Sequence, residues 1–383
     1  MNCTDRPGAF ASALFAAVAL IAAPVCKAAA QAPAPAADAP DAGAPAAVEP
    51  PAAVVTAYDP MKPATWRLSA KLPKGSALRE QLIRELTAKP KVTWQAALTR
   101  EEAEAILDDP RAELIYAERT ISIVAPSMLR RQRRGHIDLL KVFLKEERLA
   151  AAEKFVAERR ESLERAEKRH GVDKEVIVSI LMWESRLGTI TGDYVAFNSF
   201  VSQAFFIDEA NAVALSDPEE KKLLDPKSQP ARVERIRQRA RANLVVLLRV
   251  CKARGIDPLE VKGSWAGALG FPQFMPASLR WAEDGDGDGK IDLFTFDDSI
   301  ASIGRYLKDH GWAKSCEKAV WGYNHEDAYV KGVLAFADAL KKRLEKPGPR
   351  DGAENGAPKP AAEALDAGAA APIEAAAEGG AQP

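Results

Sequence analysis

Hydrophobic residues in the C-terminal half of the chain recur at helical spacing. Ile177, Ile180 and Leu181 stand at positions i, i+3 and i+4, and such residues share one buried face of a helix. The stretch from His170 to Leu344 shows neither a convincing period-2 alternation nor an internal repeat. Glycine and proline separate its helical segments. The pattern therefore predicts a mainly α domain over residues 161–345.

The preceding residues have a mixed pattern that also favours helices. The spacing from Leu82 to Leu86 indicates one helix, and the run Thr99 to Glu102 resembles a capping box that opens a second. The stretch from Leu114 to Val124 alternates enough to predict a strand or an extended connector. Helical spacing dominates from Arg131 to Lys168. We therefore expect an additional N-terminal helical region over residues 57–160.

Both ends of the chain are rich in alanine and proline and poor in large apolar residues. Residues 31–56 and 346–383 cannot bury enough apolar surface to offset the entropy lost on ordering. We expect the first segment to be a linker and the second a disordered tail.

The first residues of the chain have the features of an export signal. The apolar run from Ala9 to Ala23 is short for a membrane span, and Ala28-Ala29-Ala30 suits cleavage after small residues. We expect a cleaved signal peptide over residues 1–30, a periplasmic protein and no transmembrane span in the mature chain. Cys26 offers the alternative of a lipid anchor, but Val25 before it is larger than such sites favour.

The charge of the chain bears on its class of partner, and its cysteines bear on how its core is built. The chain has 53 basic and 54 acidic side chains and a net charge of -1, which argues against nonspecific binding of nucleic acid. The arginine-rich segment from Arg232 to Arg241 is expected to be a solvated helix face. Cys251 and Cys316 remain after signal cleavage, either as a disulfide or as two separate core residues.

One carboxyl group falls where the helical pattern favours a hydrophobic residue. Glu184 is the i+7 member of the stripe that starts at Ile177. Burial disfavours the charged form and raises the pKa of such a group, which suits a general acid near neutral pH. The alternative is structural, a salt bridge to Arg186 or to a distant arginine. Asp173 is the expected N-cap of this helix, and Gly188 is its expected end.

Three motifs stand in an order and spacing that resemble one enzyme family. They are Glu184-Ser185-x-x-Gly188, the run Gly263-Ser-Trp-Ala-Gly-Ala-Leu-Gly-Phe-Pro-Gln-Phe-Met-Pro276, and Tyr323-Asn324 followed by Tyr329. The second motif is the most specific. Over roughly Leu163 to Leu340 the chain resembles the membrane-bound lytic transglycosylase B family, which has a lysozyme-like catalytic core.

The resemblance implies a role for each motif, with Glu184 as the catalytic residue. The implied substrate-binding residues are Ser264, Gln273, Phe274, Tyr323, Asn324 and Tyr329. The first two would hydrogen-bond the glycan, the phenylalanine would form an apolar wall together with Phe271, and all three residues of the third motif would lie at the cleft. Tyr323 and Asn324 would orient the muramyl group. The expected partner is the peptidoglycan glycan strand.

The resemblance also implies a mechanism with a single carboxyl group. Glu184 would protonate the oxygen of the β-1,4 bond between MurNAc and GlcNAc. It would then accept the proton of the muramyl C6 hydroxyl, which attacks C1 and leaves a 1,6-anhydro end. Ordinary glycosidases use a second carboxylate, but here the nucleophile belongs to the substrate and has a high effective concentration. No metal or organic cofactor is required for this catalysis.

The segment 284–295 resembles an EF-hand calcium loop. The expected ligands are Asp284, Asp286, Asp288, the carbonyl of Lys290, and Asp292. The twelfth position, normally an acid, is Thr295, which removes the bidentate ligand unless Asp297 or Asp298 reaches back. We expect a structural calcium ion, with an acidic turn without metal as the alternative.

Three departures from the family pattern keep other functions open. Leu187 stands where the family carries an aromatic residue, so a stacking contact is either lost or supplied elsewhere. Phe206-Ile-Asp-Glu209 replaces a basic pair, which puts sugar or peptide contacts in doubt. Residues 208–230 look like a local insertion, which could tune substrate choice. The alternatives are a lysozyme-like muramidase that uses water and a catalytically impaired peptidoglycan-binding protein.

Overall fold

The computed structural model describes residues 57–128 and 143–345. The expected signal peptide with Cys26, the linker 31–56 and the tail 346–383 lie outside these residues.

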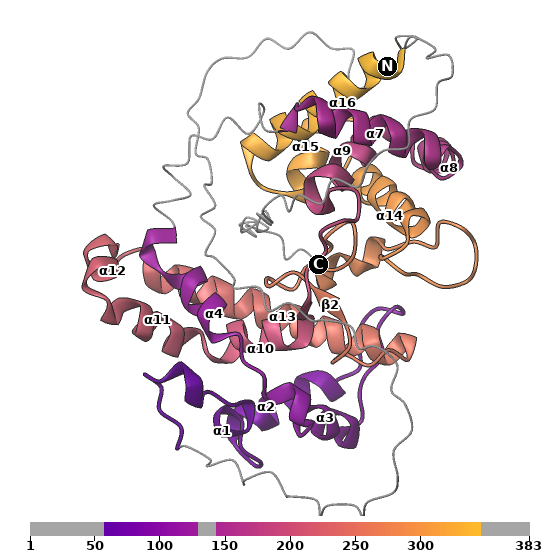
Figure 1. Cartoon of the computed structure of the whole chain (residues 1–383). Coiled ribbons are helices and arrows are strands. Elements are labelled where there is room, and N and C mark those ends of the chain that lie inside the picture. The colour runs from indigo at the N-terminus through magenta and orange to yellow at the C-terminus, as the bar shows by residue number, and fades with distance from the viewer. Residues whose placement is uncertain (1–56, 129–142, 346–383) are drawn as a thin grey trace, which may run out of the picture.

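Helices make up most of the described chain, as the sequence predicts (Figure 1). The α-helices are α1 (Leu68–Lys71), α2 (Ala77–Thr87), α3 (Arg100–Leu107), α4 (Ala117–Val124), α7 (Glu146–Glu158), α8 (Arg160–His170), α9 (Lys174–Ser185), α10 (Ala196–Phe205), α11 (Ile207–Ser216), α12 (Pro218–Leu223), α13 (Gln229–Arg254), α14 (Phe296–Asp309), α15 (Cys316–Tyr323) and α16 (Asp327–Glu345). Short 3-10 helices are η2 (Pro63–Thr65), η3 (Pro110–Glu113) and η4 (Pro276–Trp281). The strands β1 (Tyr194–Val195) and β2 (Lys262–Gly263) pair antiparallel. Strands this short cannot produce a recognisable period-2 pattern.

The helix α13 runs through the middle of the molecule and packs along α10 (Figure 1). In this view α1, α2 and α3 lie on one side of α13, and α7, α9 and α16 lie on the other. Buried side chains from Trp66 to Leu340 form one hydrophobic core. The N-terminal helices and the segments that carry the three motifs therefore share a core.

The stretch that the sequence assigns to a strand or connector is a connector only over its first three residues and is helical from Ala117 on. The start of α3 follows the prediction, because Thr99 and Glu102 form a complete capping box. By contrast, Leu114 to Val124 consists of three residues without regular secondary structure, 114–116, followed by the helix α4. Thr120, Ile123 and Val124 are buried in α4, which is i, i+3, i+4 spacing, and α4 packs on α11. Tertiary burial selects the helix over the local alternation.

Several arginines of α13 have structural contacts, which corrects the expectation of a fully solvated face, although Arg235 is exposed. Arg232 is 3% exposed and donates to carbonyl groups at the C-terminal end of α4. Arg241 pairs with Glu85 through two contacts of 2.9 and 3.0 Å. Arg249 donates to two carbonyl groups at the end of α2. The last carbonyls of a helix have no partner within it, so Arg232 and Arg249 attach the N-terminal helices by capping them, and Arg241 attaches α2 through an ion pair.

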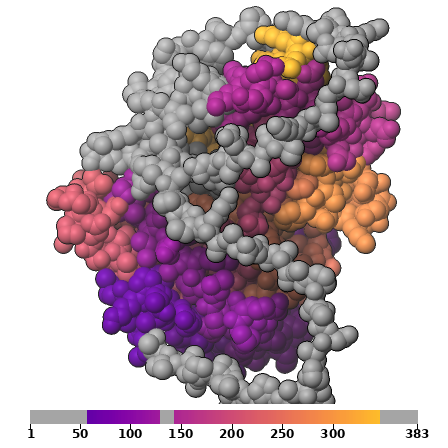
Figure 2. Space-filling model, viewed as in Figure 1, coloured from indigo at the N-terminus to yellow at the C-terminus, as the bar shows by residue number. Residues whose placement is uncertain are grey.

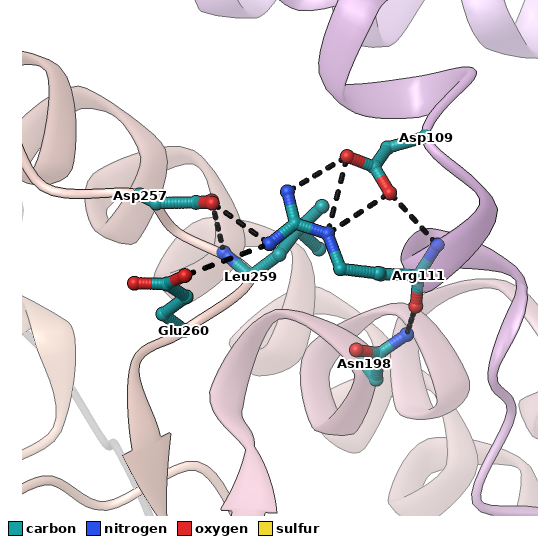
Figure 3. A network of polar contacts seen from close by, with 6 residues as sticks. All are labelled: Asp109, Arg111, Asn198, Asp257, Leu259 and Glu260. Carbon is teal, nitrogen blue, oxygen red and sulfur yellow. Dashed lines mark hydrogen bonds and ion pairs between the residues drawn. The ribbon is translucent and has the colours of Figure 1, made fainter. Parts of the chain in front are cut away.

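A further arginine joins the N-terminal region to the loop before β2 (Figure 3). Arg111 of η3 binds Asp109 and reaches Asp257 at 2.8 Å. Asn198 of α10 donates its side-chain amide to the carbonyl of Arg111 at 3.1 Å. Exposed ion pairs contribute little to stability individually, so we expect this network mainly to fix the orientation of η3 on α10.

The acidic residues that stand in place of a basic pair have structural contacts. Glu209 of α11 is 7% exposed, pairs with Lys71 and accepts a hydrogen bond from Tyr58 at 2.5 Å. Asp208 pairs with Arg237 of α13. The segment that begins at α11 therefore holds the N-terminal helices in place.

The cysteine of α13 is a buried free thiol. Burial raises the pKa of Cys251 to about 12. The disulfide between Cys251 and Cys316 is therefore not formed, and Cys251 is a small core residue.

Space-filling surfaces show two projections on opposite sides of the molecule (Figure 2). The residues of α11 and α12 project on one side, and the residues around the acidic loop and α14 project on the other. Within the described part of the chain, no helix is both long enough and apolar enough to span a bilayer.

Candidate active site

The helix α9 carries Glu184 at the end of a buried stripe. Ile177, Ile180 and Leu181 are completely buried, as their spacing predicts. Asp173 occupies the N-cap position, although its side chain makes no capping hydrogen bond. The stripe fixes the direction of the Glu184 side chain, because residues one turn apart on a helix share a face.

The chain leaves α9 through three residues with left-handed backbone conformation. Arg186, Leu187 and Gly188 have φ of 48°, 54° and 81°, so the helix ends before Gly188 rather than at it. A Cβ atom on Gly188 would come within 3.0 and 3.1 Å of two phenylalanine rings. Among the described residues, the other non-glycine residue with positive φ is Gln273, in the second motif. Such strain is typical of functional sites.

The carboxyl group of Glu184 is desolvated and accepts one hydrogen bond from the protein. Tyr329 Oη donates to Glu184 Oε1 at 2.7 Å. Desolvation raises the pKa of Glu184 to about 7, and the hydrogen bond from Tyr329 opposes this shift. Glu184 forms no ion pair with any described residue, so the expected alternative of a salt bridge to Arg186 is not realised. With this pKa the group is present as acid and as carboxylate near neutral pH.

The third motif lies against Glu184. Tyr329 is 1% exposed, and the ring of Tyr323 lies nearly parallel to it at 6.4 Å between centroids. Burial, together with the charge of Glu184, raises the pKa of both tyrosines, which keeps them protonated. The side-chain oxygen of Asn324 is buried and has no hydrogen-bond partner among the described residues. An unsatisfied buried acceptor is costly unless a ligand supplies a donor.

Hydrogen bonds connect the second motif to the third motif and to the loop that follows the first motif. Tyr323 donates to the carbonyl of Pro272 at 2.5 Å. Gln273 donates to a carbonyl of its own loop at 2.8 Å and to that of Thr191, after α9, at 3.3 Å. Ser264 Oγ accepts a backbone hydrogen bond within its own loop at 3.1 Å. The three motifs therefore form one connected unit.

The two phenylalanines expected to form an apolar wall differ in how deeply they are buried. Phe274 is 2% exposed and packs against Tyr306 and Tyr323. It belongs to the core behind the site, because the aromatic cluster covers its ring, and it does not form a wall. Phe271 stays partly exposed.

One positioning residue is absent from the motif-based prediction. Trp183 precedes Glu184, and its ring makes an edge contact with Tyr329 at 5.2 Å between centroids. A Cβ atom on Gly332 of α16 would lie 2.3 Å from the indole, so only glycine leaves room for it. A glycine inside a helix that also carries Tyr329 was the available signal.

The acidic loop brings two of the expected carboxylates together with Asp298, one of the two residues expected to reach back. Asp284, Asp286 and Asp298 have oxygen atoms within 4.8 Å of one another, and Asp298 lies in the first turn of α14. Asp288 and Asp292 lie outside this group and accept hydrogen bonds from nearby backbone amides at 2.7 and 2.9 Å. Three carboxylates at this spacing fit a hard cation that takes oxygen ligands, as Ca²⁺ does.

Structural comparison places the fold among known transglycosylase structures. The Escherichia coli lytic transglycosylase Slt35, solved in complex with bulgecin A, aligns with a TM-score of 0.52 and 21% identity over 70% of this chain and 94% of that one. Slt35 has also been solved in complex with calcium. The soluble lytic transglycosylase SltB1 from Pseudomonas aeruginosa aligns with a TM-score of 0.53 and 21% identity over 70% and 99% of the two chains. These likenesses show the expected mainly α, lysozyme-like fold.

Sequence comparison gives the family. Membrane-bound lytic murein transglycosylase B of Escherichia coli K12 is 32% identical over 161 residues, which is 42% of this chain and 37% of that relative. The match thus spans little more than a third of the relative's length. The model of the transglycosylase SLT domain matches residues 90–321, and this range starts within the expected N-terminal region. Since that match covers more than half of the sequence, the chain belongs to the transglycosylase SLT domain family.

Proposed function

We propose that the protein is a peptidoglycan lytic transglycosylase in which Glu184 acts first as general acid and then as general base. The observation that carries this proposal is the environment of Glu184: a desolvated carboxyl group with a pKa of about 7 and one bond from Tyr329. Membership of the transglycosylase SLT domain family supports the reaction class.

The first step requires Glu184 in its neutral form. Tyr329 donates to Oε1, so the acidic proton resides on Oε2. Glu184 passes this proton to the glycosidic oxygen between MurNAc and GlcNAc as the bond to C1 breaks, and the GlcNAc hydroxyl leaves. The carboxylate that remains is stabilised by the hydrogen bond from Tyr329, which is stronger to a charged acceptor.

The second step uses the carboxylate as a base. The C6 hydroxyl of the same muramyl unit attacks C1, and its proton returns to Glu184, which regenerates the acid and leaves a 1,6-anhydro end. A nucleophile within the substrate has a high effective concentration. Glu184 can perform both steps near neutral pH because its pKa lies near that pH.

The neighbouring polar groups are suited to hold the muramyl unit. The unpartnered oxygen of Asn324 would accept a hydrogen bond from a substrate N–H or O–H. Gln273 uses its amide NH₂ within the protein and would offer its carbonyl oxygen to the glycan. Ser264 would donate its hydroxyl proton, since that oxygen serves the protein as an acceptor.

A calcium ion would be held by Asp284, Asp286 and Asp298. Its contribution would be structural, because a divalent cation offsets the repulsion of three carboxylates and fixes the loop to the start of α14. We place the enzyme in the periplasm, where its substrate lies and where the expected signal peptide would direct it.

The test is digestion of purified peptidoglycan by the mature protein and by its Glu184→Gln variant, followed by mass analysis. We expect anhydro-muropeptides from the wild type alone. Hydrated reducing ends would instead identify a muramidase that uses water. Binding of peptidoglycan without any Glu184-dependent product would identify a binding protein.

A further inference from the structure

An exposed aromatic ring lies at the edge of the acidic loop. Phe294 is 40% exposed, and its ring makes an edge contact with Phe271 at 6.2 Å between centroids. Single exposed hydrophobic side chains are ordinary on protein surfaces. Phe294 differs from such residues in how firmly it is attached to the candidate site.

Backbone hydrogen bonds hold Phe294 against the second motif. The N–H of Phe271 donates to the carbonyl of Leu293 at 2.8 Å, and the N–H of Phe294 donates to Asp292 Oδ1 at 2.9 Å. A Cβ atom on Gly270 would lie 2.4 Å from Leu293, so the two segments are in close contact. The exposed ring is therefore pre-positioned, and a ligand that stacks on it loses little affinity to ordering of the protein.

A row of rings connects Phe294 to the loop that follows Glu184. A Cβ atom on Gly188 would lie 3.1 Å from the ring of Phe271, and that ring packs on Phe296 at 4.5 Å. Figure 1 shows the acidic loop projecting from the side of the molecule beyond α9 and α14. The exposed ring of Phe294 thus stands at the end of this row, separated from the loop after Glu184 by the ring of Phe271.

We infer that Phe294 is a glycan-binding residue whose exposed face stacks on a sugar ring of the strand, outside the muramyl unit that Glu184 acts on. This inference rests on the proposed function. Sugar rings present C–H faces that pack on aromatic rings, and the strand has such a face at every unit. Leu187, in the loop after α9, is partly buried, packs against the core and offers no ring, whereas the ring of Phe294 is exposed.

The test measures binding in the Glu184→Gln background, which leaves the oligosaccharides intact. Titration calorimetry would compare a peptidoglycan disaccharide with longer oligosaccharides. We expect Phe294→Ala to weaken binding of the longer oligosaccharides by roughly three- to tenfold, because an aromatic contact of this kind is lost, and to leave the disaccharide unaffected. Phe294→Trp should retain the affinity. Leu114→Ala removes another exposed side chain, 51% exposed in the N-terminal region, and should change nothing.

The outcomes separate this inference from the proposed function. Length-dependent binding that Phe294→Ala leaves unchanged would overturn the inference alone. An equal loss for the disaccharide, or an equal loss in Leu114→Ala, would also overturn it, since the effect would then come from the reaction site or from the fold. If no oligosaccharide binds even when Phe294 is present, the inference and the proposed function both fail.

Discussion

Glu184 makes the folded protein sensitive to pH. Its pKa is raised from 4.5 to about 7, so the folded state binds this proton more tightly than the unfolded state does. The stabilisation of the folded state by this proton is complete below about pH 4 and is lost as the pH rises through 7. Glu184→Gln removes the cost of burying this charge. At pH 8 we therefore expect the free energy of unfolding of the variant to exceed that of the wild type by up to about 3 kcal/mol. At pH 4 the two free energies of unfolding should be equal.

Urea unfolding at the two pH values provides the measurement. A gain in Glu184→Gln that is equal at pH 4 and pH 8 would mean that the raised pKa is not its source.

The hydrogen bond from Tyr329 favours the ionised form of Glu184 and holds its pKa down. We expect Tyr329→Phe to raise that pKa and to move the alkaline limb of the kcat/KM profile upward by roughly one pH unit. Tyr323→Phe is the matched control, because the hydroxyl of Tyr323 donates to a backbone carbonyl instead, and its alkaline limb should stay near the wild-type position. An unmoved limb in Tyr329→Phe would contradict the role of this bond.

At the scale of one element, the acidic loop and the start of α14 form a unit. Asp298 accepts hydrogen bonds from the backbone of Gly285 and of Asp292 and belongs to the group suited to a cation. We expect Ca²⁺ to raise the melting temperature of the wild type. At a Ca²⁺ concentration a hundred times its Kd, the gain in the free energy of unfolding should be about 2.7 kcal/mol. Asp298→Asn should abolish this gain.

The neighbouring Asp297 provides the control for that experiment. Its carboxylate contacts Ser162 and Arg165 of α8 and lies outside the cation group, so Asp297→Asn should keep the calcium effect. If Asp288→Asn removes the effect and Asp298→Asn does not, the ligand set expected from the sequence is the right one.

At the scale of the whole molecule, the ion pair between Lys71 of α1 and Glu209 attaches the N-terminal helices to α11, and this pair is largely buried. Lys71→Met would leave the carboxylate of Glu209, 7% exposed, without its cation. We expect the free energy of unfolding to fall by about 3 kcal/mol and the double variant Lys71→Met/Glu209→Gln to recover part of the loss. Chemical denaturation measures both. Lys62→Met breaks an exposed pair with Asp59 and should cost less than about 1 kcal/mol; an equal cost for both lysines would contradict the argument.

The sequence by itself determined the features that depend on local periodicity and on motif spacing. The stripe of α9, the capping box of α3 and the mainly α class follow from which residues share a helix face, and this depends on the backbone alone. The position of Glu184 at the end of that stripe was readable for the same reason.

Only the tertiary structure decided which groups meet across elements. It buries Phe274 and exposes Phe294, it places Asp298 rather than Asp297 next to Asp284 and Asp286, and it makes Arg232 and Arg249 of α13 caps for other helices. It also makes 117–124 a helix by packing it on α11. Contacts between residues far apart in the chain depend on how the helices pack together, and a single sequence does not reveal that packing.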